Sequence, residues 1–318
     1  MSRKRKKPTG YRTPSSASSR AAAPATTQAS GRPAGPGMLG WLSRPPVDSG
    51  WPSIGKALGR GFITVGSSPL VLLSSFVLVF ALWLALIGLG LEGPPGRLVN
   101  LLALPPISTY FDALNGVTIY GFGPMGFIAA TAFLLVRSVL LALITALIVW
   151  VYEGEGTLGE TLARGARVIP VAMAVNLLTL AMMVAGSIVL PVLGAGLGFL
   201  ASVLTLVAAL FLFVFAPVVA LREPGRPLLD VVRRGARAAL MPGSRHLLMC
   251  LFYIFLTLPI LVALAPGGAL LGVNPAAATW VYALLCTYVH LSFLAAFAFR
   301  FMSIEDEVPD EPVRIRRR

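Results

Sequence analysis

The chain has 318 residues, of which 56% are hydrophobic and 12% are charged, with a mean hydropathy of +0.81 and a net charge of +13. Soluble domains carry about 25% charged residues, so this composition excludes an ordinary soluble protein and indicates an integral membrane protein. The positive charge does not indicate a nucleic acid partner, because the basic residues cluster at the ends of apolar segments, as membrane orientation signals do.

Residues 1–52 form a basic tail with few large apolar side chains. The tail begins with the run RKRKK and continues with a stretch rich in Ser, Ala, Pro and Gly. Such a segment buries too little apolar surface to offset its conformational entropy, so we predict a disordered cytoplasmic tail. The basic run has two interpretations: it binds anionic lipid headgroups, or it only holds the N-terminus in the cytoplasm.

Residues 53–302 form the predicted membrane domain, which is all-helical and contains six apolar segments. Each segment is close to the roughly 20 residues that cross a bilayer as a helix. The predicted spans cover residues 70–91, 127–152, 171–190, 197–221, 247–265 and 276–299. A short charged cytoplasmic tail, residues 303–318, follows them.

Lys and Arg are distributed unevenly among the segments that connect the spans. The chain up to Arg60 carries 11 of them, the connection between the second and third spans 2, the connection between the fourth and fifth spans 6, and the end from Arg300 another 5. The connections on the other side contain only Arg97. By the positive-inside rule, both termini are predicted to face the cytoplasm.

A short basic segment precedes each pair of spans, and the three segments align without gaps. Their sequences are SIGKALGRGFI, TLGETLARGAR and PLLDVVRRGAR, at residues 53–63, 157–167 and 227–237. One column of the alignment holds Arg60, Arg164 and Arg234, and the next holds Gly61, Gly165 and Gly235. Apolar residues four apart with arginine opposite them predict amphipathic helices along the membrane surface. We therefore predict three repeats, each an interfacial helix followed by a helical hairpin.

These segments also carry local helix signals. The shared glycine lies on the apolar side, where a missing side chain would let a neighbouring helix or lipid approach closely. Thr157 and Glu160 match a capping box at the start of the second helix. Acid–base pairs four residues apart, Glu160 with Arg164 and Asp230 with Arg234, are expected to stabilise two of the helices.

The longest connection, residues 92–125, is apolar and aromatic. We expect it to pack as a cap over the outer end of the bundle, and a binding loop is the alternative. Gly194 and Gly198 form a Gly-x-x-x-Gly pair, which we interpret as close helix packing beside a turn at residues 190–196. Pro217 and Pro259 predict kinks in the fourth and fifth spans.

The sequence contains no recognisable catalytic motif. The stretch GWPSIGKA at residues 50–57 is one residue shorter than a phosphate-binding P-loop and follows no strand. The two cysteines, Cys250 and Cys286, are predicted to differ in depth by about 15 Å, which excludes a disulfide between them. The two histidines and two cysteines lack metal-ligand spacing. We therefore expect a protein that is not an enzyme and holds no cofactor or metal.

Three polar side chains lie inside predicted spans: Arg137, Asn176 and His290. Arg137 is about 22 Å from the cytoplasmic end of its span, and it either extends to the outer headgroups or has a functional role. Asn176 indicates an interhelical hydrogen bond, and His290 indicates a hydrogen-bonded structural histidine, with a proton relay as the alternative. Their estimated depths differ, so the three residues could line a path but do not define one compact site.

The segment TLGETLARGAR, the stretch FVFAPVVALREPGRPLLDVVRRGAR and the apolar hairpins carry a resemblance to known proteins. Over residues 53–302 the chain resembles a group of bacterial six-helix membrane proteins, which includes the membrane domain of some glycerophosphoryl diester phosphodiesterases. The resemblance implies a location in a bacterial inner or plasma membrane, and it implies no activity.

Two functional hypotheses follow from these observations. The leading one is a non-enzymatic membrane protein whose basic cytoplasmic collar holds anionic lipid or a partner protein. The predicted collar consists of Arg60, Arg164, Arg167, Arg233, Arg234 and Arg237. The alternative is a transporter or lipid-moving protein with a polar path past Arg137, Asn176 and His290. An intramembrane enzyme ranks third, because no nucleophile with a neighbouring base is visible.

Overall fold

The computed structural model describes residues 51–88, 103–105, 123–241, 245–263 and 275–308. The chain divides into two units, Met1–Ser43 and Arg44–Arg318, and the described residues all belong to the second. The predicted disorder of the N-terminal tail, most of the long connection and the end of the charged C-terminal tail lie outside the described residues.

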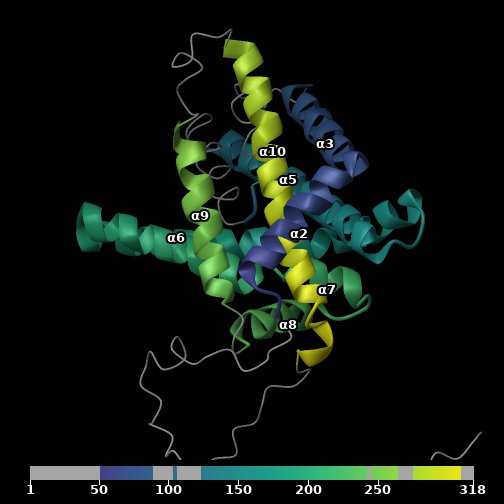
Figure 1. Ribbon diagram of the computed structural model, residues 1–318. Helices are drawn as coiled ribbons and strands as arrows, with labels where there is room; N and C mark the ends of the chain where they lie inside the picture. The colour runs from purple at the N-terminus through teal and green to yellow at the C-terminus, as the bar shows by residue number, and fades with distance from the viewer. Residues whose placement is uncertain (1–50, 89–102, 106–122, 242–244, 264–274, 309–318) are drawn as a thin grey trace, which may run out of the picture. The chain divides into compact units, whose positions relative to one another are not determined.

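Every described element is a helix, which confirms the all-α class (Figure 1). The α-helices are α2 (Ile54–Ser67), α3 (Pro69–Gly88), α5 (Pro124–Glu153), α6 (Leu158–Phe213), α7 (Ala216–Arg222), α8 (Leu228–Leu240), α9 (His246–Ala263) and α10 (Pro275–Met302). The 3-10 turn η3 (Glu305–Glu307) follows α10. The most extensive contacts join α5 to α6 and α2 to α10.

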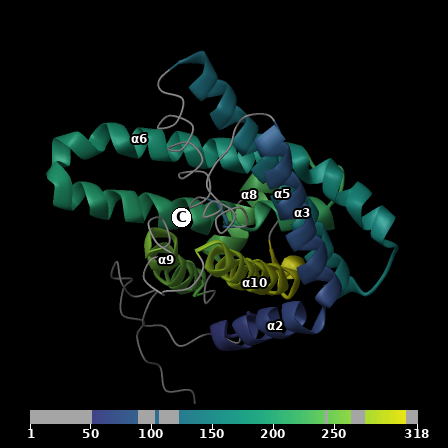
Figure 2. The same ribbon diagram turned by 90° about the horizontal axis from the view of Figure 1, so that it is seen from above.

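Helix α6 is a hairpin of two limbs that run side by side (Figure 2). Gly194 separates the limbs, with φ 78° and ψ 167°, a backbone region that essentially only glycine occupies. The turn predicted at residues 190–196 is therefore confirmed. A Cβ on Gly194 would meet no atom of the described residues within 4 Å, so they show no helix packing at this glycine. Its backbone conformation, not the space around it, requires glycine.

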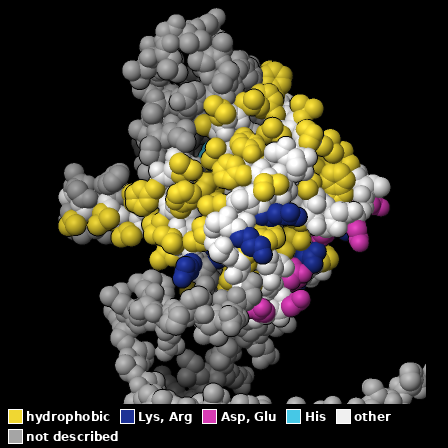
Figure 3. All heavy atoms as spheres, viewed as in Figure 1, with side chains coloured by type: hydrophobic (Ala, Val, Ile, Leu, Met, Phe, Trp, Pro, Cys, Tyr) yellow, Lys and Arg dark blue, Asp and Glu magenta, His cyan; other side chains and the backbone are white. Residues whose placement is uncertain are grey.

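Among the described residues, four helical segments are long and apolar enough to cross a membrane: Pro124–Glu153, Leu158–Met183, Val203–Arg222 and Leu284–Met302. The α2–α3 pair, bent by 79°, is a fifth candidate if the two helices form one span. Hydrophobic side chains cover much of the described surface in Figure 3, and Leu73, Phe127 and Phe255 are each more than 60% exposed. Apolar surface on this scale is typical of a protein that is embedded in lipid.

The amphipathic segments differ in how they join the spans that follow. Helix α2 is bent sharply from α3 at Ser68, because the residue before Pro69 is disfavoured in the helical conformation. The second segment is not a separate interfacial helix, which corrects that part of the predicted repeat. Helix α6 continues from Leu158 past Pro170 and has non-helical angles only at Gly194. Pro170 removes one backbone hydrogen bond without ending the helix.

The helix boundaries follow the local signals of the sequence. Both bonds of the capping box are present: the Thr157 N–H donates to Glu160 Oε2 at 2.8 Å, and the Glu160 N–H donates to Thr157 Oγ1 at 3.3 Å. Gly154 ends α5 in the left-handed region, with φ 69°. Helix α6 ends at Phe213 and α7 begins at Ala216, with Pro217 in its first turn, so the chain has a helix boundary where a kink was predicted.

The shared glycines of the three amphipathic segments lie where helices cross closely. A Cβ on Gly61 would lie 2.3 Å from the carbonyl oxygen of Ser292 in α10. A Cβ on Gly165 would lie 3.0 Å from the Cβ of Ala146 in α5. A Cβ on Gly235 would lie 3.1 Å from the backbone nitrogen of Ala216 in α7. The predicted close approach at these glycines is confirmed.

The core near the helix ends is aromatic. The His246 ring stacks on Phe215 with centroids 4.4 Å apart, and the guanidinium carbon of Arg300 lies 4.8 Å from the centre of the Trp51 ring. His246 and Arg300 are both buried. Cys250 and Cys286 are buried free thiols, as predicted.

Candidate functional site

The three polar residues predicted inside spans line one cavity. Arg137 comes from α5, Asn176 from α6 and His290 from α10, and all three are at least 96% buried. The cavity has a volume of about 20 Å³, enough for one or two water molecules. The remaining lining consists of Ala103, Leu104, Pro105, Leu140, Leu141, Ile144, Leu291 and Leu294.

The prediction that Arg137, Asn176 and His290 do not define one compact site is wrong, because all three line the same cavity. The predicted third span starts at residue 171, whereas α6 begins at Leu158, close to the end of α5. Asn176 is then about 27 Å along α6, and Arg137 is about 24 Å from the end of α5 at Glu153. The continuity of α6 through the amphipathic segment therefore brings the two residues to similar levels.

Arg137 does not extend to outer headgroups, because its side chain lies inside the protein with 4% of its surface exposed. A guanidinium in the interior of a helix bundle is costly to desolvate and is retained where it lines a polar site or pairs with other groups. Its position in the cavity wall therefore favours the functional interpretation over the snorkelling one.

His290 is hydrogen-bonded, as predicted, and its partner comes from α9. Its Nδ1 lies 3.0 Å from the hydroxyl of Tyr253, which also accepts a hydrogen bond from the backbone N–H of Leu104 at 2.8 Å. When the hydroxyl uses its own proton to donate to Nδ1, the imidazole carries its proton on Nε2. The connected groups join α9 and α10 to the described part of the long connection.

Asn176 makes the predicted interhelical hydrogen bond. Its Nδ2 donates to Ser138 Oγ at 2.9 Å, and Ser138 Oγ in turn donates to the Leu134 carbonyl at 2.7 Å. Ser138 follows Arg137 directly, so this bond fixes α6 against the part of α5 that carries the arginine. Sequence analysis did not identify Ser138 or Tyr253, although both are polar residues within apolar helices.

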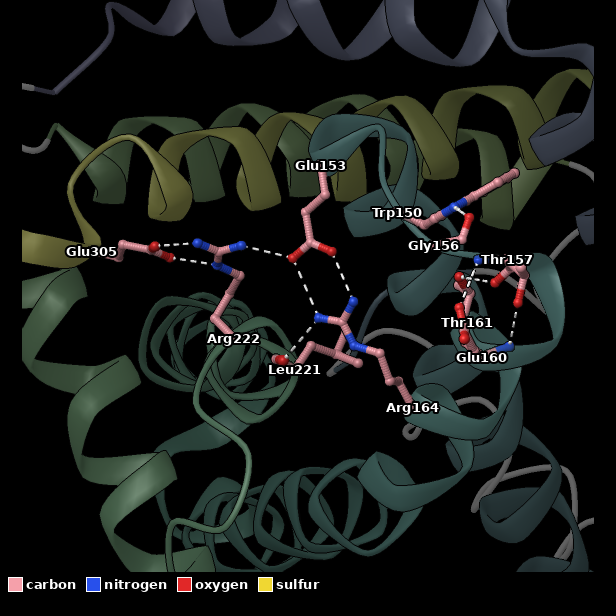
Figure 4. A network of polar contacts seen from close by, with 10 residues as sticks. All are labelled: Trp150, Glu153, Gly156, Thr157, Glu160, Thr161, Arg164, Leu221, Arg222 and Glu305. Carbon is pink, nitrogen blue, oxygen red and sulfur yellow. Dashed lines mark hydrogen bonds and ion pairs between the residues drawn. The ribbon is translucent and has the colours of Figure 1, made fainter. Parts of the chain in front are cut away.

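A second polar cluster lies at the ends of several helices (Figure 4). The carboxylate of Glu153, at the end of α5, accepts from Arg164 Nη1 at 2.8 Å and from Arg222 Nη1 at 2.7 Å. Arg222 also pairs with Glu305 through two hydrogen bonds. Arg164 donates to the Leu221 carbonyl at 3.3 Å. These contacts connect α5, α6, α7 and η3.

The same arrangement recurs one helix pair later. Arg234 forms an ion pair with Glu223 and donates to the backbone carbonyls of Glu305 and Val308 at 3.0 and 2.9 Å. Glu223 precedes Arg234 by 11 residues, the spacing that also separates Glu153 from Arg164. Sequence analysis missed both glutamates, and this constant spacing is the signal that could have identified them.

The structure divides the predicted collar into two groups. Arg164 and Arg234 pair with the glutamates of the neighbouring helices. The four-residue spacing had predicted a pair between Arg164 and Glu160, but the partner of Arg164 is Glu153. Asp230 was the predicted partner of Arg234, which instead pairs with Glu223. The Oδ1 of Asp230 lies 3.7 Å from Nη1 of Arg233. Arg237 is half-buried, whereas the other three collar residues are exposed: Arg60, Arg167 and Arg233.

The ion pairs shift the pKa values of Glu153 and Arg222, each of which lies one residue beyond a predicted span, 127–152 or 197–221. Burial alone would raise the pKa of Glu153, but the hydrogen bonds and charges of Arg164 and Arg222 outweigh it and hold that pKa below its usual value of 4.5. The hydrogen bonds to Glu305 raise the pKa of Arg222 above its ordinary value. All these groups are therefore charged near neutral pH.

Within the described residues, no group of three or more His, Cys, Asp or Glu side chains is placed to hold a metal ion. Comparison with protein-family models, with curated proteins and with solved structures gives no match.

Proposed function

We propose that the chain is a multi-pass protein of a bacterial inner or plasma membrane, built from three repeats with six spans and with both termini in the cytoplasm. The glycine contacts support the repeats, because each amphipathic segment packs on the second helix of another predicted repeat: α2 on α10, α6 on α5, and α8 on α7. This cyclic order is what a three-fold arrangement of the repeats requires. The distribution of Lys and Arg supports the orientation.

We further propose that the protein moves a small polar molecule, or the polar headgroup of a lipid, through the helix bundle. The observation that carries this proposal is the meeting of Arg137, Asn176 and His290 from three helices in one buried cavity. Buried polar and charged groups inside a membrane domain are costly and mark substrate or ion pathways. The cavity holds only water-sized molecules in this conformation, so transport requires a second, more open conformation.

The first test asks whether water reaches the cavity. Both native cysteines are replaced by alanine, Asn176→Cys is introduced, and the full chain in lipid nanodiscs is exposed to a water-soluble maleimide. Thr145→Cys is the control, because Thr145 is equally buried in α5 but does not line the cavity. Labelling at position 176 and not at 145 is expected. Equal absence of labelling at both positions, in a protein that remains folded, contradicts a transport path.

The second test looks for the transported molecule. Native mass spectrometry of the purified chain is expected to show a retained small molecule or lipid that is lost in Arg137→Ala and in His290→Ala. Ser75→Ala is the control, because its hydroxyl is buried outside the cavity lining. Retention that is unchanged in both cavity variants contradicts the proposal.

The second candidate function is a scaffold whose exposed arginines hold anionic lipid or a partner protein. The exposure of Arg60, Arg167 and Arg233 favours it, whereas the pairing of Arg164 and Arg234 with glutamates reduces the charge that the collar can offer. A non-enzymatic role is common to both candidates.

A further inference from the structure

The three aligned arginines differ in their partners. Arg164 and Arg234 each pair with a glutamate that lies 11 residues earlier, at the end of the helix on which their segment packs. In both cases this glutamate lies seven residues after the alanine that contacts the shared glycine, Ala146 or Ala216.

The corresponding position beside Arg60 lacks a carboxylate. Gly61 packs on Ala296 of α10, and the seventh residue after Ala296 is Ser303, an exposed residue whose hydroxyl donates to the Phe299 carbonyl at 2.7 Å. Arg60 is exposed, and none of the ion pairs among the described residues involves it. The α2–α10 crossing thus retains the close packing at the shared glycine, but the position of the glutamate that would pair with the arginine is occupied by Ser303.

The outer face of α2 changes from cationic to apolar along its length. Lys56, Arg60 and Ile63 follow one another at helical spacing and are all exposed, with Ile63 63% exposed. Leu70 and Leu73, on α3 just after the bend at Ser68, are also exposed. In Figure 3, basic side chains lie among hydrophobic ones on the face where Figure 1 shows α2. A phospholipid is complementary to this face, because its anionic phosphate would meet the basic residues and its apolar chains would meet the apolar residues.

We propose that Arg60 and Lys56 bind the phosphate of an anionic membrane lipid, which takes the place that the glutamate carboxylate has beside Arg164 and Arg234. The acyl chains of this lipid lie along Ile63 and the exposed leucines of α3. The inference specifies the lipid-binding candidate function at Arg60 and rests on the proposed membrane location, and it is independent of transport through the cavity. An acidic partner protein is disfavoured, because it would have to cover the apolar residues that the bilayer already covers.

The test compares lipid retention by the full chain and its variants. Each protein in detergent is titrated with phosphatidylglycerol or phosphatidylcholine, and native mass spectrometry measures the bound fraction. Arg60→Gln is expected to weaken phosphatidylglycerol binding about fivefold, the effect of one basic residue at a membrane surface. Ser303→Glu is expected to weaken it to a similar extent while all the basic residues remain, because the new carboxylate pairs with Arg60. A parallel titration with inorganic phosphate distinguishes a lipid site from a site for the free anion.

Arg245→Gln is the matched control, because it removes one charge from another exposed arginine. Unchanged phosphatidylglycerol binding in Arg60→Gln or in Ser303→Glu, an equal loss in Arg245→Gln, or equal binding of phosphatidylcholine overturns the inference. Competition by inorganic phosphate without lipid selectivity does so as well. If the wild-type chain does not float with liposomes, the proposed membrane location fails instead, so the two failures are distinguishable.

Discussion

The α2–α10 crossing and the α6–α5 crossing use the same small residues but differ in charge. At the α6–α5 crossing, Glu153 of α5 forms an ion pair with Arg164 of α6. At the α2–α10 crossing, the equivalent arginine stays exposed, yet the backbones approach most closely: a Cβ on Gly61 would lie 2.3 Å from a carbonyl oxygen, against 3.0 Å from a methyl carbon at Gly165. The comparison indicates that glycine packing fixes the helix arrangement, whereas the ionic partner can change without loss of the crossing.

This difference has a physical basis. Close backbone approach gains dispersion and weak Cα–H···O contacts that lipid cannot replace, because lipid chains compete poorly for a groove lined by small residues. An ion pair at a half-exposed helix end contributes less, because water screens it. Steric changes at the glycines should therefore have larger effects than charge changes at the arginines.

Substitution of Gly61 should have the largest effect on stability. Gly61→Ala places a methyl group against the backbone of Ser292 and Ala296, and we expect a loss of about 1–3 kcal/mol from overpacking. The control is Gly59→Ala, because a Cβ there meets no atom within 4 Å and alanine favours a helix by about 0.5–1 kcal/mol. Thermal unfolding of both variants in one detergent measures the difference. Equal unfolding midpoints would show that packing at Gly61 does not determine the crossing.

Removal of the Glu153 charge should have the next largest effect. Glu153→Gln leaves Arg164 and Arg222 without their shared carboxylate, and we expect the free energy of unfolding to fall by about 1–2 kcal/mol. The loss is smaller than for a fully buried ion pair, because the Arg164 side chain is 41% exposed and water screens its charge. Glu155→Gln is the control, since Glu155 is exposed two residues further on. Arg60→Gln, which breaks no ion pair of the described residues, should leave the unfolding temperature unchanged. A larger loss in Arg60→Gln than in Glu153→Gln would reverse the comparison.

Much of the fold could be predicted because its signals are local. The capping box at Thr157, the turn at Gly194 and the close approach at the shared glycines each depend on a few neighbouring residues, and each is present in the structure. The bonds between distant segments could not be predicted in the same way. The contact from Leu104 to Tyr253 joins residues 149 positions apart, and nothing in the spacing of either residue indicates the other.

The candidate site shows the same division. The residue types of Arg137, Asn176 and His290 identified them as exceptional within apolar spans, but their meeting depends on where α6 begins. An estimate based on hydropathy placed the start of the span at residue 171, whereas the helix starts 13 residues earlier, at Leu158. Hydropathy measures the apolar stretch and not the length of the helix, so it misjudged the level of Asn176.

Acid pH should have the smallest effect, through the pKa of Glu153. The folded-state pKa lies below the usual 4.5, because the bonds from Arg164 and Arg222 outweigh burial. A carboxyl group with a lowered folded-state pKa stabilises the protein fully above its unfolded-state pKa, and this contribution is lost as the pH falls through the folded-state pKa. The difference in unfolding temperature between wild type and Glu153→Gln should therefore be constant from about pH 6 to about pH 8 and should shrink below about pH 4.5. Other carboxylates titrate in both proteins and largely cancel in the difference. A difference that grows on acidification would mean that protonated Glu153 stabilises the fold, which is incompatible with its role as the anionic partner of two arginines.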